Sequence, residues 1–306
     1  MSPDLCVCAD MNVQRNEGMK KYLGPLYLTL AASIWGGVYV VSKIVLTVLP
    51  ALELVWIRYV IALTTLGLFA RIRGDSWHIP RQSMPVVVLI GIVGYFISIW
   101  AQFAGTHLSS AQMGSVITAA TPAFMVIFAR WLLHEPITAK KAISLLLATA
   151  GVLCIVGVGE MGDATRLGGL ILGVAAITWA LMSVLVKKIP AECSLIVVTT
   201  YAILAATLAM TPVAVMQMKP EHWQVIFRAD ILAGILYIGI ISTAGAFYFW
   251  NRGLQMVDAG TGGLYFFFQP LVGTLFGWIF LGEQVGWPFW LGAALIFAGV
   301  ILVIRE

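Results

Sequence analysis

One stretch of the chain, from Gly105 to Gly151, recurs 148 positions later without a gap. An offset of 144 extends the repeat toward the N-terminus, where Trp35 pairs with Trp179 and Lys43 with Lys187. Chance similarity between two apolar segments would favour Leu and Val, whereas the paired residues here include glycine, proline and glutamate: Gly105/Gly253, Ala111/Ala259, Gly114/Gly262, Pro122/Pro270, Phe128/Phe276, Leu133/Leu281, Glu135/Glu283 and Gly151/Gly299. The pattern indicates an internal duplication, so both halves are expected to fold alike.

Composition places this duplicated chain in a membrane. Of its 306 residues 60% are hydrophobic and 10% are charged, and the mean hydropathy is +0.95. A soluble domain carries about 25% charged residues, because its surface must be wetted. The lipid bilayer is therefore an expected partner, and the small net charge of +4 gives no indication of nucleic-acid binding.

Apolar runs of about 20 residues cross the hydrocarbon core as helices, because every backbone group must be hydrogen-bonded inside the segment. We predict an all-α membrane protein with ten transmembrane helices, at residues 24–46, 52–72, 83–104, 110–132, 137–158, 167–188, 194–216, 230–250, 260–281 and 287–304. Residues 1–21 are polar and lack the apolar region of a secretory signal. They are expected to be a disordered tail, or to precede a start at Met11 or Met19.

Basic residues predict the orientation of these helices. With the N-terminus inside, only Arg166, Lys219 and Arg228 fall in outer connections, while most Lys and Arg residues lie on the cytoplasmic side. Both termini are then cytoplasmic in a multi-pass protein of the cell membrane. Five helices per copy is an odd number, so residues 22–158 and 167–305 form inverted five-helix repeats around a central cavity.

Several stretches resemble the EamA family of the drug/metabolite transporter superfamily. They are Ala31 to Gly37 with Lys43 and Arg58, and Leu281 to Glu283 followed by Leu291 to Val300, the latter repeated more loosely at His134 to Pro136 and Ala148 to Val152. The chain departs from the family pattern at His134, where glycine is common, and at Gln284, where proline is common. The resemblance implies a basket-like bundle that exports small metabolites, often amino acids, by alternating access.

Two prolines within predicted spans are the first candidates for a solute site. Pro122 and Pro270 are expected in mid-span, where proline removes a helical hydrogen bond and bends the helix. Within the membrane, the carbonyl that loses this hydrogen bond is tolerated where it faces protein or a water-filled cavity. The polar neighbours Thr121 and Gln269 and the aromatic Tyr265 are therefore candidates to line that cavity, although kinks for packing alone would give the same pattern.

Tryptophans and amides form a second group of candidates. Trp35 and Trp179 occupy equivalent positions well inside the first and sixth spans, where a buried indole N–H needs a partner. Two further pairs, Trp100 with Gln102 and Trp250 with Asn251, lie near the ends of the third and eighth spans. These residues are expected to line the cavity, but Trp100 and Trp250 could equally be interfacial anchors.

Charged residues inside spans are costly and mark functional positions by default. Lys43 could reach the outer interface or face the cavity, and Arg58 could bind a substrate carboxylate or the carbonyls of a helix end. Glu53 is expected to stay at the outer interface. Glu135, like its counterpart Glu283, is expected to cap the first turn of the helix that follows it.

These features predict a secondary transporter that uses no cofactor and no metal. Its substrate is a small molecule, such as an amino acid with an apolar or aromatic side chain. Coupling to protons or to exchange stays open, as does the oligomeric state, for which a monomer suffices. The alternatives are a passive pore, a lipid flippase or a membrane-embedded enzyme, and no H-E-x-x-H motif supports the last of these.

Overall fold

The computed structural model describes residues 3–108, 117–156, 163–281 and 286–304, and all regular structure in these ranges is helical. The first half contains α1 (Pro3–Val45), α2 (Ala51–Arg73), α3 (Met84–Leu89), η1 (Ile90–Ser98), α4 (Ile99–Leu108), α6 (Thr121–Leu133) and α7 (Ala139–Val156). The second half contains α8 (Asp163–Val186), α9 (Leu195–Gln217), α10 (Pro220–Ile226), α11 (Ala229–Leu236), η2 (Tyr237–Gly245), α12 (Ala246–Leu254), α13 (Ala259–Leu264), η3 (Tyr265–Phe267), α14 (Phe268–Leu281) and α15 (Trp287–Ile304).

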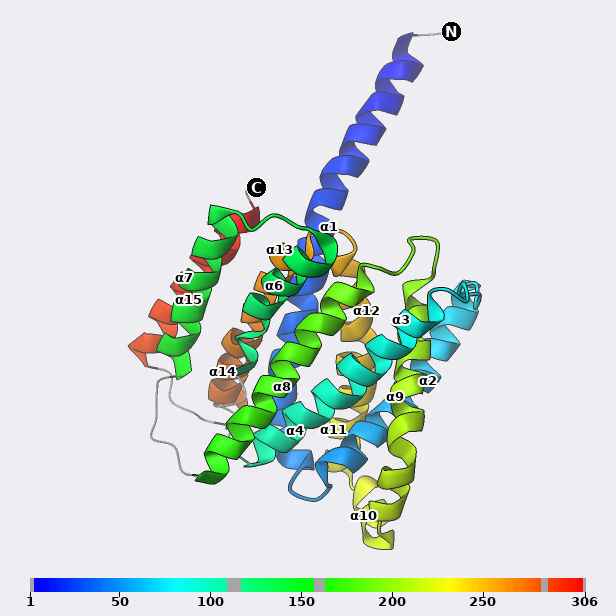
Figure 1. Ribbon diagram of the computed structural model, residues 1–306, viewed down its shortest axis with the longest axis vertical. Helices are drawn as coiled ribbons and strands as arrows, with labels where there is room; N and C mark the ends of the chain where they lie inside the picture. The colour runs from blue at the N-terminus through cyan, green and yellow to red at the C-terminus, as the bar shows by residue number, and fades with distance from the viewer. Residues whose placement is uncertain (1–2, 109–116, 157–162, 282–285, 305–306) are drawn as a thin grey trace.

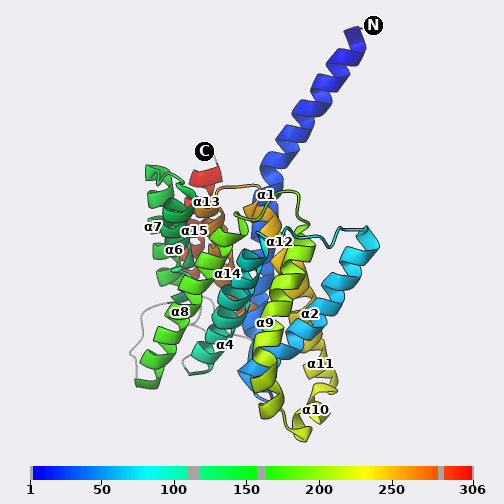
Figure 2. The same ribbon diagram turned by 45° about the vertical axis from the view of Figure 1, so that its right-hand side comes forward.

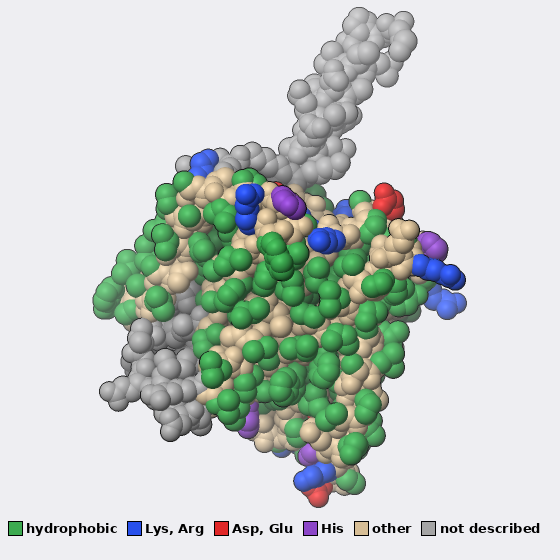
Figure 3. Space-filling model, viewed as in Figure 1, with side chains coloured by type: hydrophobic (Ala, Val, Ile, Leu, Met, Phe, Trp, Pro, Cys, Tyr) green, Lys and Arg blue, Asp and Glu red, His purple; other side chains and the backbone are tan. Residues whose placement is uncertain are grey.

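Six of the described helices are long and apolar enough to cross a membrane, and they correspond to six of the predicted spans. They are Tyr22–Ser42, Ala51–Arg73, Met84–Leu108, Leu167–Val186, Leu195–Gln217 and Ala229–Leu254, while Thr121–Leu133 and Trp290–Leu302 are shorter apolar helices. On the face shown in Figure 3, hydrophobic side chains cover the middle of the molecule and charged side chains gather toward its two ends. The chain is therefore a multi-pass membrane protein.

Two predicted spans differ from the structure because they are not continuous helices. The described part of span 110–132 has a turn at Ala119 and Ala120 before α6 begins at Thr121, and span 260–281 is divided into α13, a short 3₁₀ turn and α14. Pro122 and Pro270 thus lie in the first turn of a helix. There the missing N–H costs little, and the regular α-helix is interrupted just before each proline, by the turn at Ala119 and Ala120 and by the 3₁₀ turn Tyr265–Phe267.

The N-terminal residues also differ from expectation. Helix α1 begins at Pro3 and projects beyond the bundle (Figure 1), so the polar leader continues the helix of the first span. The physical reason is that Gly18 is the only glycine or proline between Pro3 and Gly24, and nothing else there strongly opposes helix.

Three close contacts of glycine occur twice, at positions related by the duplication. A Cβ atom added to each of these glycines would lie 2.2–3.3 Å from the neighbour named, so each pair of helices touches through backbone. The contacts are Gly105 on Leu172 and Gly253 on Leu28, Gly91 on Ala202 and Gly239 on Arg58, and Gly151 on Gly292 and Gly299 on Ser144. The two halves therefore share packing as well as sequence.

The ribbon shows how the halves are placed. Helices α1 and α8, which begin the two halves, run in opposite directions, and α7 and α15 pack together at one edge (Figures 1 and 2). The start of α1 and the end of α15 lie at one end of the bundle, and α10 lies at the other. Aromatic side chains fill the centre, among them the fully buried Tyr59, Tyr95, Phe247 and Trp250.

Candidate solute-binding cavity

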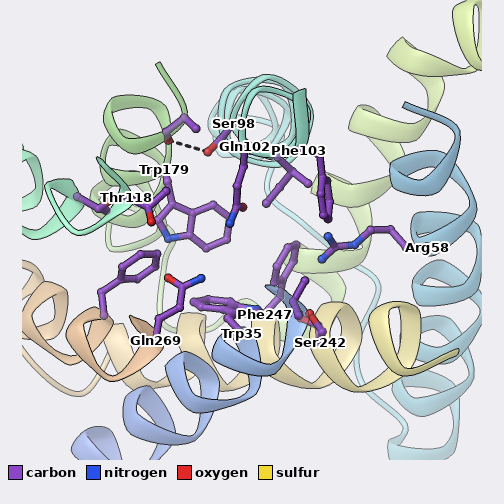
Figure 4. A pocket seen from close by; sticks show the side chains of 15 residues that line it. Trp35, Arg58, Ser98, Gln102, Phe103, Thr118, Trp179, Ser242, Phe247 and Gln269 are labelled. Atoms are coloured by element: carbon purple, nitrogen blue, oxygen red, sulfur yellow. Dashed lines mark hydrogen bonds between the residues drawn. The ribbon is translucent and has the colours of Figure 1, made fainter. Parts of the chain in front are cut away.

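A small cavity lies among the helices of both halves, close to this aromatic centre (Figure 4). Its volume is about 30 Å³, which is room for about one water molecule. Of the sequence-predicted candidates, it is lined by Trp35, Arg58, Gln102, Thr121, Trp179 and Gln269. Residues distant in sequence thus meet here because α1, α2, α4, α6, α8 and α14 converge.

Trp35 and Trp179 form one wall of the cavity. Each is 6% exposed, and their rings meet edge to face with centroids 5.2 Å apart and planes at 90°, a favourable arrangement for two aromatic rings. The Trp35 indole N–H donates to the Ser242 carbonyl oxygen at 2.9 Å. The Trp179 indole N–H has no hydrogen-bond partner among the described residues, so the equivalent positions differ in what they can still bind.

Arg58 supplies the positive charge of the cavity. It is the eighth residue of α2, which places it about 10 Å along the helix, and it is only 2% exposed. Its Nε donates to Thr243 Oγ1 at 2.8 Å. The guanidinium carbon lies 5.6 Å from the ring centres of Tyr59 and Phe103 and 5.8 Å from that of Phe247, within the range of cation–π attraction.

Polar side chains complete the lining. Gln269 and Thr121 are 3% and 1% exposed, and Gln102 and Thr118 also line the cavity (Figure 4). Asp, Glu, Lys and His are absent from the described lining. The described lining therefore offers hydrogen bonds, aromatic faces and the cation of Arg58.

Other predicted candidates lie outside the lining. Trp100 is 41% exposed on the surface, while Trp250 is fully buried and donates to Ser183 Oγ at 3.0 Å. Asn251 donates to the hydroxyls of Tyr95 and Thr199, both at 2.9 Å. The remaining candidates outside the described lining are Pro122, Pro270 and Tyr265, which are buried. The side chain of Lys43 is outside the described residues.

The interfacial-anchor alternative is consequently wrong for Trp250. Its ring packs 5.3 Å from that of Trp35 and 5.6 Å from that of Phe266, so it supports the wall of the cavity from behind. Asn251 likewise holds Tyr95 in place through its side-chain amide.

The sequence prediction missed several lining residues: Ser98, Phe103, Thr118, Ser242, Phe247 and Phe266. Ser98 donates to the Ala175 carbonyl oxygen at 2.8 Å, shown as the dashed line in Figure 4. The duplication contained a signal for four of them, because an offset of 144 also relates Ser98 to Ser242 and Phe103 to Phe247.

Glu53 lies in the first turn of α2, next to α10, and is buried there. It is 0% exposed, and its Oε2 lies 2.7 Å from Nδ1 of His222 in α10. Its Oε1 has no partner among the described residues. The sequence could not reveal this pair, because the two residues are 169 positions apart.

Glu135 does cap a first turn, but in the other half of the chain. Its two carboxylate oxygens accept from the backbone N–H groups of Ala259 and Gly260 at 2.9 and 3.1 Å, so it caps α13 and not α7. Nearby, Lys141 pairs with Asp258 at 3.3 Å. The counterpart Glu283 lies outside the described residues.

Lys187 lies at the same end of the molecule as Glu135 and Lys141. Its ammonium donates to the carbonyl oxygens of Leu254 and Val257 at 3.1 and 2.5 Å. Burial lowers the pKa of Lys187, and the negative charges of Glu135 and Asp258 oppose that effect. Together with the Glu135 cap, these contacts tie α7 and α8 to the segment between α12 and α13.

No group of three or more His, Cys, Asp or Glu residues that could hold a metal ion occurs in the described part of the chain.

Comparison with known proteins agrees with this architecture. The uncharacterized transporter YetK of Bacillus subtilis is 25% identical over 94% of this chain and 88% of its own. The S-adenosylmethionine/S-adenosylhomocysteine transporter of Chlamydia muridarum is 24% identical over 86% of each chain. The permease-like protein YdzE of Bacillus subtilis is 65% identical, over 23% of this chain and 91% of its own.

The fold also occurs among solved structures. One crystal structure superimposes with a TM-score of 0.76 at 19% identity, covering 91% of this chain and 95% of the other. A model of the EamA-like transporter family matches residues 22–157 and again residues 166–305. Since these two matches span nearly all of the apolar sequence, the chain belongs to the EamA-like transporter family.

Proposed function

We propose that this protein is a secondary transporter that moves a small organic metabolite across the cell membrane by alternating access, without ATP. The observation that carries the proposal is the cavity between the halves, where Trp35 and Trp179 face Arg58, Gln102 and Gln269. Transporters built from repeats bind their solute near the midplane between the copies. Apolar walls with a few polar groups are typical of small-molecule sites.

The size of the cavity supports alternation over a permanent pore. A volume of about 30 Å³ is too small for an organic solute, so the helices that line the cavity have to move apart for a solute to bind. The proposed frame is a ten-helix inverted repeat with both termini in the cytoplasm. The opposite directions of α1 and α8 support the inversion, and the basic residues at the cytoplasmic connections support the orientation.

The solute that fits the lining best is an amino acid with an apolar or aromatic side chain. The ring faces of Trp35, Trp179 and Phe247 would cover its apolar part, and the amides would bind its polar groups. Export is the direction that the family resemblance implies. Because one relative is named for S-adenosylmethionine transport, that compound belongs among the candidates to be tested.

Counterflow into proteoliposomes tests the proposal. Purified protein is reconstituted with a panel of unlabelled amino acids and S-adenosylmethionine inside, and uptake of labelled solute is followed with and without a pH gradient. We expect saturable counterflow of one compound class. Flux that rises linearly with concentration would identify a passive pore, and exchange of labelled phospholipid between leaflets would identify a flippase.

A further inference from the structure

Arg58 is a buried cation without a counter-charge. Its Nε is bonded to Thr243, and no carboxylate of the described residues contacts its guanidinium. The one acid on the same helix, Glu53, is paired with His222. Figure 4 shows the side chain reaching from α2 toward the cavity, with the guanidinium near Phe103 and Phe247.

A charge in this position is costly. Removing an ion from water carries a large penalty, which a close opposite charge or several hydrogen bonds must offset. The three aromatic rings around Arg58 offset only part of it, because cation–π attraction is weaker than an ion pair. Arg58 therefore retains unused capacity to bind an anion.

The hydrogen bonds of Thr243 fix the orientation of the Arg58 guanidinium. Thr243 accepts from Arg58 and donates its own hydroxyl proton to the Ile238 carbonyl oxygen at 2.6 Å, so its lone pairs point to Nε. The two terminal nitrogens of Arg58 have no hydrogen bond among the described residues. A planar pair of N–H groups matches the two oxygens of a carboxylate.

We propose that Arg58 is the anion subsite of this cavity and binds the carboxylate of the transported solute. A single charge is favoured over a phosphate dianion because Arg58 is the only charged residue in the described lining. The body of the solute then lies against Trp35 and Trp179. This inference rests on the proposed transport function and adds to it the required charge of the substrate.

The test compares acids with their uncharged analogues. Wild-type protein in lipid nanodiscs is titrated with L-phenylalanine, L-leucine, L-methionine and 3-phenylpropionate, and with the carboxamide of each, while the thermal unfolding midpoint and tryptophan fluorescence are recorded. We expect at least one acid to raise the midpoint and its amide to have no effect. Equal effects of acid and amide, no effect of any acid, or the same shift from chloride alone would overturn the proposal.

Substitutions at Arg58, Thr243 and Arg71 test whether the acid binds at Arg58. Arg58→Gln should weaken binding of the acid by about 10- to 100-fold, which is the range expected for hydrogen bonds to a charged group. Arg58→Lys should retain weaker binding, since an ammonium cannot make the bidentate contact. Thr243→Val should lose several-fold through misplacement of Arg58, and Arg71→Gln, at the exposed end of the same helix, is the matched control.

The outcomes separate this proposal from the transport function. If Arg58→Gln kept the acid preference, the subsite would be disproved, and the acid–amide comparison in wild-type protein decides the question even if that variant does not fold. Saturable counterflow of an uncharged solute that Arg58→Gln leaves intact would also disprove the subsite, while transport would stand. Binding of acids without counterflow of any compound would retain the subsite and refute transport.

Discussion

At the residue scale, Trp35 and Trp179 show how two equivalent residues can take different tasks. The indole N–H of Trp35 is bonded to Ser242, whereas that of Trp179 has no partner among the described residues. A buried donor without a partner costs free energy, and a solute that accepted a hydrogen bond from Trp179 would recover it. Trp179 is thus the better candidate for direct contact with a solute.

We therefore expect Trp179→Phe to weaken mainly the binding of the solute and Trp35→Phe to weaken mainly the stability of the fold. Trp179→Phe keeps a ring and removes the free donor, so the half-saturation concentration in counterflow should rise about fivefold, as for the loss of one hydrogen bond. Trp35→Phe should mainly lower the thermal unfolding midpoint, because it leaves the Ser242 carbonyl without its donor. Identical profiles for the two variants would contradict this assignment.

The buried pair of Glu53 and His222 gives a second prediction at this scale. His222→Ala leaves a side-chain oxygen of Glu53, which is 0% exposed, without its partner, and leaving a buried acceptor unsatisfied in this way costs about 1–3 kcal/mol. We expect Glu53→Gln/His222→Ala to be destabilised by clearly less than the sum of the single variants in chemical unfolding. Additive effects would show that the pair is not coupled.

At the scale of elements, α13 depends on a residue from the other half. Its own N-cap residue, Asp258, makes no side-chain cap hydrogen bond, and Glu135 supplies both acceptors instead. Glu135→Ala should lower the free energy of unfolding by about 1–2 kcal/mol, as for loss of a helix cap. Exposed Glu192→Ala is the control, and an equally small effect of both would refute the cap.

Close helix contacts give a second prediction for the elements. A Cβ at Gly91 would lie 2.2 Å from the Ala202 carbonyl oxygen, whereas a Cβ at Gly173 meets nothing within 4 Å. Gly91→Ala should destabilise the protein by about 1–3 kcal/mol through overpacking of η1 against α9. Gly173→Ala should be neutral or stabilising, because alanine favours helix, and the two unfolding midpoints test the contrast.

Much of this element structure follows from the sequence, and the reasons for the exceptions are physical. Trp35 and Trp179 could be predicted because the duplication fixed equivalent positions in α1 and α8. The prediction that Trp100 lines the cavity failed, whereas Gln102 two residues later does line it. Successive residues turn about 100° around a helix, and an apolar helix has no polar face to show which side is buried. The Glu53–His222 and Glu135–α13 contacts join distant segments and have no local signal.

At the scale of the whole molecule, equivalent connections lie at opposite ends. Residues 74–83, between α2 and α3, are at the end that holds the start of α1, while α10, between α9 and α11, is at the other (Figure 1). This placement is what an inverted repeat requires.

Labelling in intact cells tests that arrangement. In a background without native cysteines, exposed Trp223→Cys in α10 should react with an impermeant maleimide from outside. Exposed Ser76→Cys should react only after permeabilisation. Reaction of both from the same side would refute the inverted arrangement, and with it the proposed two-sided carrier.

The small central cavity has a consequence for the proposed transport. Under that mechanism the cavity, with space for about one water molecule, has to widen for a metabolite and narrow again in each cycle, and such collective motions take microseconds to milliseconds. The transport rate should then rise steeply with temperature and saturate at high solute concentration. It should also slow when bilayer composition stiffens the helices, even if affinity is unchanged.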